Sequence, residues 1–278
     1  MPLVTMTQLL TTAAAHHRGL GAMNVIQLEH AEAIVTGAER AGLPVVLQVS
    51  ENTIAYHGSL APILTATLAV AAGSTADVCV HLDHATDIEL IHAAVQLGVP
   101  SVMYDASALE HDDNVARTAA VVSWCHERGV AVEAELGEVG GKDGVHAPGV
   151  RTDPAQAATY VHATGVDALA VAIGSSHAMT TRDAVLDDAL IAELAARVTV
   201  PLVLHGSSGV DDAGLVSAVA AGMTKINIAT HLNSVLTRAV REALLDEALV
   251  DPRKYLGPGR DAVADEVARL LTLLSPAA

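Results

Sequence analysis

Short apolar runs alternate with longer amphipathic segments along the whole chain. Eight runs rich in Val, Leu, Ile and Ala predict buried strands, and they cover residues 21–25, 44–50, 77–84, 101–107, 131–137, 167–177, 201–209 and 225–230. Apolar residues recur with helical spacing in the segments between them, for example 27–42, 87–98, 114–129, 153–165 and 211–222. Several of these segments end in glycine, the usual helix C-cap. Eight strand and helix pairs predict an α/β fold, a (β/α)8 TIM barrel, because alternating strands and helices form a parallel sheet that eight strands can close.

Two further segments lie outside this repeat. Met6 to His17 predicts a helix over the N-terminal end of the barrel. Residues 253–274 predict a loop and then an amphipathic C-terminal helix that closes the barrel or meets another subunit. No linker interrupts the pattern, so we expect residues 1–278 to form a single domain. A doubly wound open sheet is the competing architecture, but no G-x-G-x-x-G follows the first strand.

The charge balance narrows the range of partners. The chain has 15 Lys and Arg against 32 Asp and Glu, a formal net charge of −17, so neither nucleic acid nor an anionic membrane is expected as a partner. An anionic substrate would need a locally cationic site, which a metal ion and backbone N–H groups can supply. The sequence has no apolar stretch of about 20 residues that could cross a bilayer and no secretory signal pattern at its start. We therefore expect a cytoplasmic protein.

Polar residues gather where the predicted strands end, and in a TIM barrel this end carries the chemistry. The residues at these ends are Asn24, Ser50, Asp83, His84, Asp105, Ser107, Glu133, Glu135, His177, His205, Ser207, Asn227 and Thr230. Three imidazoles with an open fourth position are a common arrangement at catalytic Zn²⁺. One histidine would more often fill a polar rim, but His84, His177 and His205 stand at equivalent places on three non-adjacent strands. They favour a metal site.

The stretch "HLDH" at the third strand end holds residues with different expected roles. In a regular strand His81 and Asp83 face one side and His84 the other. His81 and His84 would therefore make a poor pair of ligands for one metal ion, and we assign His81 a structural role. Asp83 is either a group that passes a proton to a substrate oxygen or an acceptor that orients a histidine. Asp105 and Glu135 are hard oxygen ligands for a second cation, or for the same one in another position. Glu133 is expected to be a hydrogen-bonded residue of the barrel.

The seventh and eighth strand ends have the composition of a phosphate site. "HGSSGV" at 205–210 and "NIAT" at 227–230 place glycine, hydroxyl and amide groups there. Barrels often bind phosphate at this position through backbone N–H groups.

The motifs resemble those of one family. They are "GAMNV", "HLDHA", "SVMYDAS", "EAELGEVGG", "TGVDALAVAIGSSH", "VPLVLHGSSGV" and "GMTKINIAT". In this order, and over nearly the whole length, they make the chain similar to class II, metal-dependent ketose-bisphosphate aldolases, the fructose- and tagatose-bisphosphate enzymes. The resemblance implies a lyase of carbohydrate metabolism, of the kind that works in glycolysis. Its reaction would cleave a ketose 1,6-bisphosphate to dihydroxyacetone phosphate and an aldehyde such as glyceraldehyde 3-phosphate.

The resemblance also implies roles for individual residues. His84, His177 and His205 would bind a catalytic Zn²⁺ that polarises the ketone, and Asp83 would be the proton donor. Asp105 and Glu135 would match the second metal position of the family. The residues expected to contact the substrate are Asn24, Ser50, Ala178, Gly206, Ser207, Ser208, Asn227, Ile228, Ala229 and Thr230. Family members also often use a monovalent cation, Na⁺ or K⁺, near the phosphate, and are commonly dimers or tetramers.

Three positions depart from the family pattern. Ala229 places the chain on the tagatose-like side, since fructose-type members tend to read N-x-D-T. Ala178 replaces a glycine that carries a phosphate or cation contact. Lys142 stands where a glutamate usually acts as base, so Asp143 or Glu138 would have to substitute. The alternatives are a metal-dependent aldolase or lyase acting on a different phosphorylated sugar or sugar acid, and a catalytically silent barrel that binds a phosphorylated metabolite or a partner protein.

Overall fold

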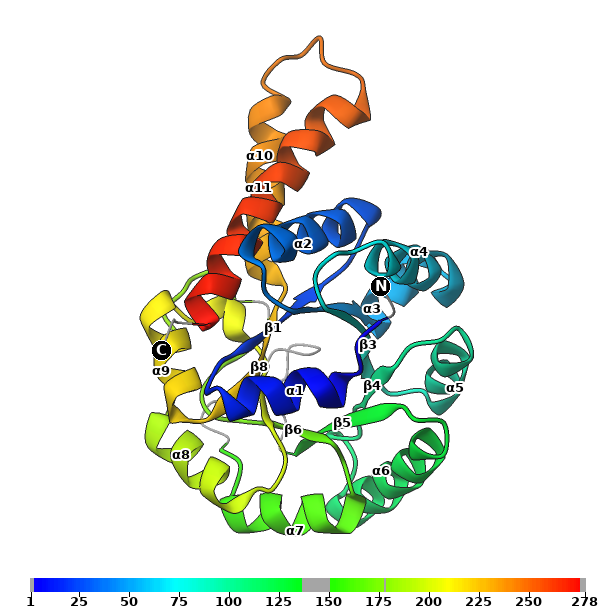
Figure 1. Cartoon of the computed structure of the whole chain (residues 1–278), viewed down its shortest axis with the longest axis vertical. Helices are drawn as coiled ribbons and strands as arrows, with labels where there is room; N and C mark the ends of the chain where they lie inside the picture. The colour runs from blue at the N-terminus through cyan, green and yellow to red at the C-terminus, as the bar shows by residue number, and fades with distance from the viewer. Residues whose placement is uncertain (1–2, 137–150, 178, 276–278) are drawn as a thin grey trace.

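Eight parallel strands close into a barrel in chain order, which confirms the predicted (β/α)8 TIM barrel (Figure 1). The computed structural model describes residues 3–136, 151–177 and 179–275. The strands are β1 (Leu20–Asn24), β2 (Val45–Ser50), β3 (Val78–Ala85), β4 (Ser101–Tyr104), β5 (Ala131–Leu136), β6 (Ala168–Val171), β7 (Leu202–Leu204) and β8 (Met223–Ile228). The sixth and seventh strands are shorter than the apolar runs predict, because the ends of those runs form the loops that lead into the site.

Helices surround the barrel and cover its outer face (Figure 1). They are α2 (Leu28–Ala41), α3 (Glu51–His57), α4 (Leu60–Ala72), α5 (Ile88–Gln96), α6 (His111–His126), α7 (Pro154–Thr164), α8 (Asp188–Arg197), α9 (Asp212–Ala221), α10 (Thr230–Ala243) and α11 (Pro252–Leu274). A short 3₁₀ helix, η1 (Ser207–Gly209), lies in the loop after β7. Outward strand residues such as Leu47, Leu82 and Ile226 pack with the surrounding helices in one large apolar cluster. Among the described residues, no single helix is long and apolar enough to span a bilayer. The α3–α4 pair passes that test only when taken together and is bent by 117°.

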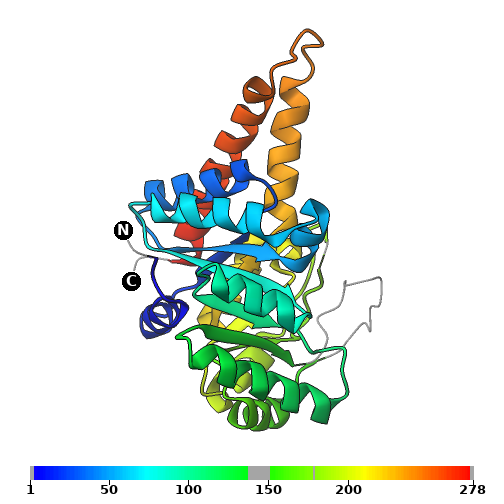
Figure 2. The ribbon, with the colours of Figure 1, turned by 90° about the vertical axis from the view of Figure 1, so that its right-hand side faces the viewer.

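The N-terminal helix α1 (Met6–Ala15) lies across one end of the barrel, as predicted (Figures 1 and 2). Thr5 and Gln8 form a capping box at its start, which satisfies backbone donors that a helix end leaves free. Leu9 and Leu10 pack against inward residues of the barrel in a second apolar cluster. This end of the barrel is therefore filled by hydrophobic side chains, and polar inward residues lie toward the other end.

Helices α10 and α11 form a hairpin that projects away from the barrel (Figures 1 and 2). The prediction of a loop after Pro252 is wrong, because α11 begins at Pro252 and runs without a break through Pro258. Asp251 caps its start, where a proline is tolerated. Gly259 is buried, and a Cβ there would lie 3.0 Å from Val240 of α10. Close packing of the two helices thus overrides the local preference of the G-P-G sequence for a loop.

Candidate active site

A cavity of 520 Å³ opens at the C-terminal end of the barrel, where βα barrels carry their chemistry. The residues that line it follow β1, β2, β3, β6, β7 and β8: Asn24, Ser50, Glu51, Asn52, Ala55, Asp83, His84, Thr86, His177, His205, Gly206, Ser208, Asn227, Ala229 and Thr230. A larger cavity of 790 Å³ lies beside α1 at the opposite end. The smaller cavity is the candidate active site, because it contains the cluster of Asp83, His84, His177 and His205.

Strand β3 delivers both Asp83 and His84 to this cavity, although they are adjacent in sequence. Asp83 shares the inward face with His81, as alternation predicts. His84 has a φ of 52°, and the pairing of β3 with β4 shifts register between Leu82 and Ala85. A left-handed backbone is uncommon for a residue other than glycine, and here it turns the His84 imidazole over the barrel mouth. A regular strand would not bring His84 to the same side as Asp83.

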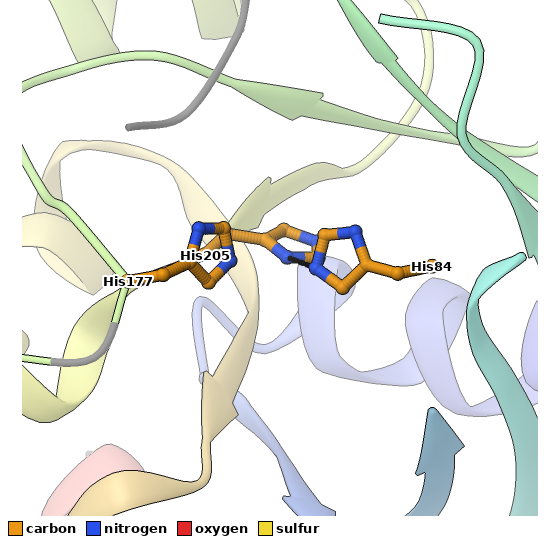
Figure 3. Close-up of side chains that lie close together, drawn as sticks. All are labelled: His84, His177 and His205. Carbon is orange, nitrogen blue, oxygen red and sulfur yellow. Dashed lines mark hydrogen bonds between the residues drawn. The ribbon is translucent and has the colours of Figure 1, made fainter. Parts of the chain in front are cut away.

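Three histidines meet above the barrel axis (Figure 3). His84, His177 and His205 each offer a nitrogen, and these nitrogens lie within 4.8 Å of one another. The ring centroids of His84 and His205 are 4.5 Å apart, and that of His177 lies 5.1 Å from the first and 5.6 Å from the second. The expectation of three non-adjacent strands is wrong, because β6 and β7 pair with each other. His177 reaches the group from the loop after β6 rather than from the strand.

The outer nitrogens of two of these rings are held by carboxylates. His205 Nε2 donates to Glu133 Oε1 at 2.9 Å, and His84 Nδ1 donates to Asp105 Oδ2 at 2.9 Å. The inner nitrogens, His205 Nδ1 and His84 Nε2, face each other at 2.8 Å. Ligand histidines in metalloproteins nearly always donate their other N–H to a carboxylate or carbonyl in this way. The donor set therefore fits a cation that prefers imidazole nitrogen.

The electrostatics of His205 agree with that fit. Burial, aided by His84, His177 and Lys225, lowers the pKa of His205 well below its ordinary value of 6.5. A neutral imidazole is the form that binds a metal.

A second possible donor group shares His84 with Asp105 and Glu135. Asp105 Oδ1 accepts hydrogen bonds from the backbone N–H and the hydroxyl of Ser107, while its other oxygen accepts from His84. In this arrangement Asp105 orients His84, and Glu135 lies next to the pair. The side chains predicted for a second metal position thus lie close together, and they share His84 with the three-histidine group.

Asp83 is 3% exposed and is fixed by amide side chains. Asn24 Nδ2 donates to Asp83 Oδ2 at 2.9 Å, and Gln48 Nε2 donates to Asn24 Oδ1 at 3.1 Å. Burial alone would raise the pKa of Asp83, but His84, His205 and Lys225 together lower it below its ordinary value of 3.8. Its other oxygen, Oδ1, is buried without a hydrogen-bond partner among the described residues. Asp83 therefore has one carboxylate oxygen held by Asn24 and the other without a hydrogen-bond partner among the described residues.

The loops after β7 and β8 are tied together beside the histidines. Gly206 has a φ of 68°, and a Cβ there would lie 2.6 Å from the backbone of Ser176, so only glycine allows the loops after β6 and β7 to approach this closely. The Ser207 hydroxyl donates to the carbonyl of Asn227. Ser208 Oγ accepts from the backbone N–H groups of Ala229 and His231 at 3.2 Å. These segments thus place hydroxyl and backbone N–H groups at the edge of the cavity.

Three residues predicted for the site, Glu138, Asp143 and Ala178, lie outside the described residues, and so does Lys142, which stands where the family usually has its base. Conversely, the structure places Lys225 in the barrel interior and brings Gln48 into contact with Asn24. The sequence patterns did not identify Lys225 or Gln48 as interior residues near the site. Strand alternation could have found them, because Lys225 stands two residues before Asn227 and Gln48 two before Ser50.

Comparisons with known proteins agree with this geometry. The sequence model of a family described as "Fructose-bisphosphate aldolase class-II" matches residues 4–277. A "Probable fructose-bisphosphate aldolase" of Bacillus subtilis (strain 168) is 40% identical over 274 residues, which cover 96% of this chain and 95% of the relative. A "Fructose-bisphosphate aldolase" of Staphylococcus aureus (strain Mu50 / ATCC 700699) is 38% identical over 272 residues, with the same shares covered. The crystal structure of the YdjI aldolase from Escherichia coli K12 aligns with a TM-score of 0.88 at 32% identity, covering 98% of this chain and 97% of that one.

Proposed function

The chain belongs to the class II fructose-bisphosphate aldolase family, a family of carbon–carbon lyases, and on that premise we propose that it is a Zn²⁺-dependent aldolase of ketose 1,6-bisphosphates. The products are dihydroxyacetone phosphate and an aldehyde such as glyceraldehyde 3-phosphate. The observation that carries this proposal is the cluster of three imidazoles beside the buried carboxyl group of Asp83. We expect residues 1–278 to act as one domain.

His84, His177 and His205 are the residues that would hold Zn²⁺. When bound there, the ion supplies a Lewis acid for the ketone of the substrate. Glu133 and Asp105 keep two of the rings oriented through their outer nitrogens. Asp105 and Glu135 with His84 would form the second position for a cation.

Asp83 is the group that would move a proton at the carbon–carbon bond. In cleavage its carboxylate takes the proton of the hydroxyl that becomes the aldehyde, and in condensation it returns that proton to the aldehyde oxygen. Asn24 holds one carboxylate oxygen and leaves the other for the proton. The base that acts on dihydroxyacetone phosphate would be Asp143 or Glu138.

The loops after β7 and β8 would bind the phosphate of the dihydroxyacetone phosphate end. Gly206, Ser208, Asn227, Ala229 and Thr230 line the cavity there, and Ser207 and Ile228 would contribute through their backbone groups. Asn24 and Ser50 line the same cavity. Ala178 and a monovalent cation, Na⁺ or K⁺, would complete this phosphate site.

We propose fructose- or tagatose-type substrates, and Ala229 favours the tagatose type. The experiment measures the zinc content of the purified enzyme and then its cleavage of fructose and tagatose 1,6-bisphosphate in coupled assays. We expect about one zinc per chain and turnover of at least one of the two sugars, with both lost in His84→Ala. Stoichiometric zinc without turnover of either would contradict this substrate class and favour another phosphorylated sugar or sugar acid.

We also propose a cytoplasmic homo-oligomer, a dimer or tetramer. The tip of the α10–α11 hairpin supports it, because Leu245 and Val250 are 82% and 84% exposed there. Apolar side chains at the end of a projecting arm gain from contact with a second copy.

A further inference from the structure

A buried ion pair lies directly beneath the histidine cluster. Lys225 of β8 is 0% exposed, and its Nζ lies 2.7 Å from Glu133 Oε2 of β5, a residue that is itself 3% exposed. Glu133 is not a cavity-lining residue, and the proposed reaction gives Lys225 no part.

The pair is not needed to fill the barrel. Lys225 pairs in register with Leu20 of β1 and Val203 of β7, and both of these inward residues belong to the apolar cluster around α1. Burying two charges costs several kcal/mol per ion, and apolar replacements of such pairs are often neutral or stabilising (~1–4 kcal/mol). A role outside stability would explain why the interior holds the pair.

Glu133 joins this ion pair to the metal site. Its Oε2 accepts from Lys225, and its Oε1 accepts from His205 Nε2 at 2.9 Å. The carboxylate therefore cannot rotate without losing one of its two partners. With its plane fixed, the carboxylate favours the tautomer of His205 that carries its proton on Nε2, and Nδ1 faces His84.

The neighbouring groups offer Glu133 few alternatives. His81 Nε2 lies 3.8 Å from Glu133 Oε2, beyond hydrogen-bond distance, and His81 Nδ1 is engaged by the Ser101 hydroxyl at 2.8 Å. Asn227 Nδ2 approaches the His205 ring at 3.2 Å. Lys225 is thus the strong partner that decides where Glu133 points.

We propose that the Lys225–Glu133 pair is a positioning device that fixes the ring plane and tautomer of His205 for metal binding. The proposal rests on the metal site of the proposed function but not on its substrate. Lys225 and Glu133 touch neither substrate nor metal, and they act through His205 alone.

The test measures the dissociation constant of Co²⁺ by chelator competition, together with the visible spectrum of the Co²⁺ protein. Lys225→Met leaves Glu133 without its anchor and should weaken Co²⁺ binding about 10- to 100-fold, the range found for outer partners of ligand histidines. Lys254→Met, on the exposed face of α11, is the matched control and should bind as the wild type does.

Two double variants keep the test decisive if Lys225→Met does not fold. Glu133→Leu with Lys225→Met removes both charges and the acceptor, and it should fold but bind Co²⁺ about 10- to 100-fold more weakly, with a changed spectrum. Glu133→Gln with Lys225→Met keeps an acceptor for His205 and should recover most of that loss.

A folded Leu/Met double variant with wild-type Co²⁺ affinity and spectrum would overturn the positioning role. Failure of the wild type to cleave either bisphosphate while these metal-binding differences persist would contradict only the substrate assignment. The two failures are therefore distinguishable.

Discussion

At the scale of single residues, Asp83 owes its proposed role to the amide group of Asn24 and to the histidines beside it. Asn24 hydrogen-bonds one oxygen of the carboxylate, and the histidines favour its charged form. Positioned acid–base groups contribute about 10²- to 10⁴-fold to a rate. A substitution that removes the carboxylate charge of Asp83 but keeps the shape of its side chain therefore separates proton transfer from metal binding.

Asp83→Asn is expected to keep wild-type zinc content and to lose cleavage by about 10²- to 10⁴-fold. Zinc analysis and steady-state assays on the same preparation measure both quantities. Asp77→Asn, an exposed residue just before the other end of the strand, is the control and should be fully active. Wild-type turnover by Asp83→Asn would end the assignment.

Substitutions at Gly206 can separate two reasons for a glycine, the close approach of two loops and the left-handed backbone. Gly206 and Gly58 have φ values of 68° and 69°, but a Cβ on Gly206 would meet Ser176 at 2.6 Å, whereas one on Gly58 would meet nothing within 4 Å. Both alanine variants should lose about 1–2 kcal/mol to the left-handed backbone. Only Gly206→Ala should lose more and also bind dihydroxyacetone phosphate more weakly, as thermal melts and calorimetric titration can measure. Equal losses in the two variants would show that the contact with Ser176 is unimportant.

At the scale of elements, α11 connects the start of α10 with the start of α9. Glu266 accepts from His231 Nε2 and from Arg269, and Arg269 also binds Asp212, which Arg182 contacts from the loop after β6. Burial would raise the pKa of Glu266, but hydrogen bonds from Arg269 and His231 lower it from 4.5 to about 2. A carboxylate with a lowered pKa stabilises the fold above its unfolded pKa and loses that effect as the pH falls.

Glu266→Gln should therefore be less stable than the wild type at pH 7 and nearly equal to it near pH 2. We expect the difference to shrink by about 1–2 kcal/mol between pH 5 and pH 2, after allowance for solvent screening. Urea unfolding across this range measures it. Asp265→Asn removes an exposed ion pair with Arg40 one residue away and should show no such closing difference. If the free energies of unfolding of Glu266→Gln and the wild type differed by the same amount at every pH, the lowered pKa of Glu266 could not be the cause of that difference.

Sequence patterns predicted the regular strands of this fold better than the places where the backbone departs from a regular pattern. Alternation put His81 and Asp83 on one face of their strand and gave Glu133 and Glu135 the same face of theirs, because side chains on one face of a strand recur at every second position. It could not predict that His84 turns inward, since that depends on a register shift between β3 and β4. The straight path of α11 through Pro258 depends on packing against α10 in the same way. Local sequence does not encode either contact.

At the scale of the whole molecule, the barrel and the α10–α11 arm can be altered separately. The arm tip lies away from the barrel (Figure 2), so charges introduced there should not disturb the histidines. Leu245→Glu with Val250→Glu should shift the proposed oligomer toward smaller species, as light scattering can measure. Val185→Glu introduces one such charge at a residue 82% exposed outside the arm and should leave the mass unchanged. An unchanged mass in the arm variant would place the subunit contact elsewhere.

The backbone of His84 has a consequence for how this protein can evolve. A left-handed residue other than glycine or asparagine costs about 1–2 kcal/mol, so His84 is held in a conformation that its own side chain disfavours. Selection for thermostability and selection for chemistry therefore act on this position in opposite directions. A glycine would relieve the backbone but remove an imidazole. Directed evolution for heat tolerance alone should drift toward such replacements here, and lose one imidazole of the three-histidine cluster as it gains stability.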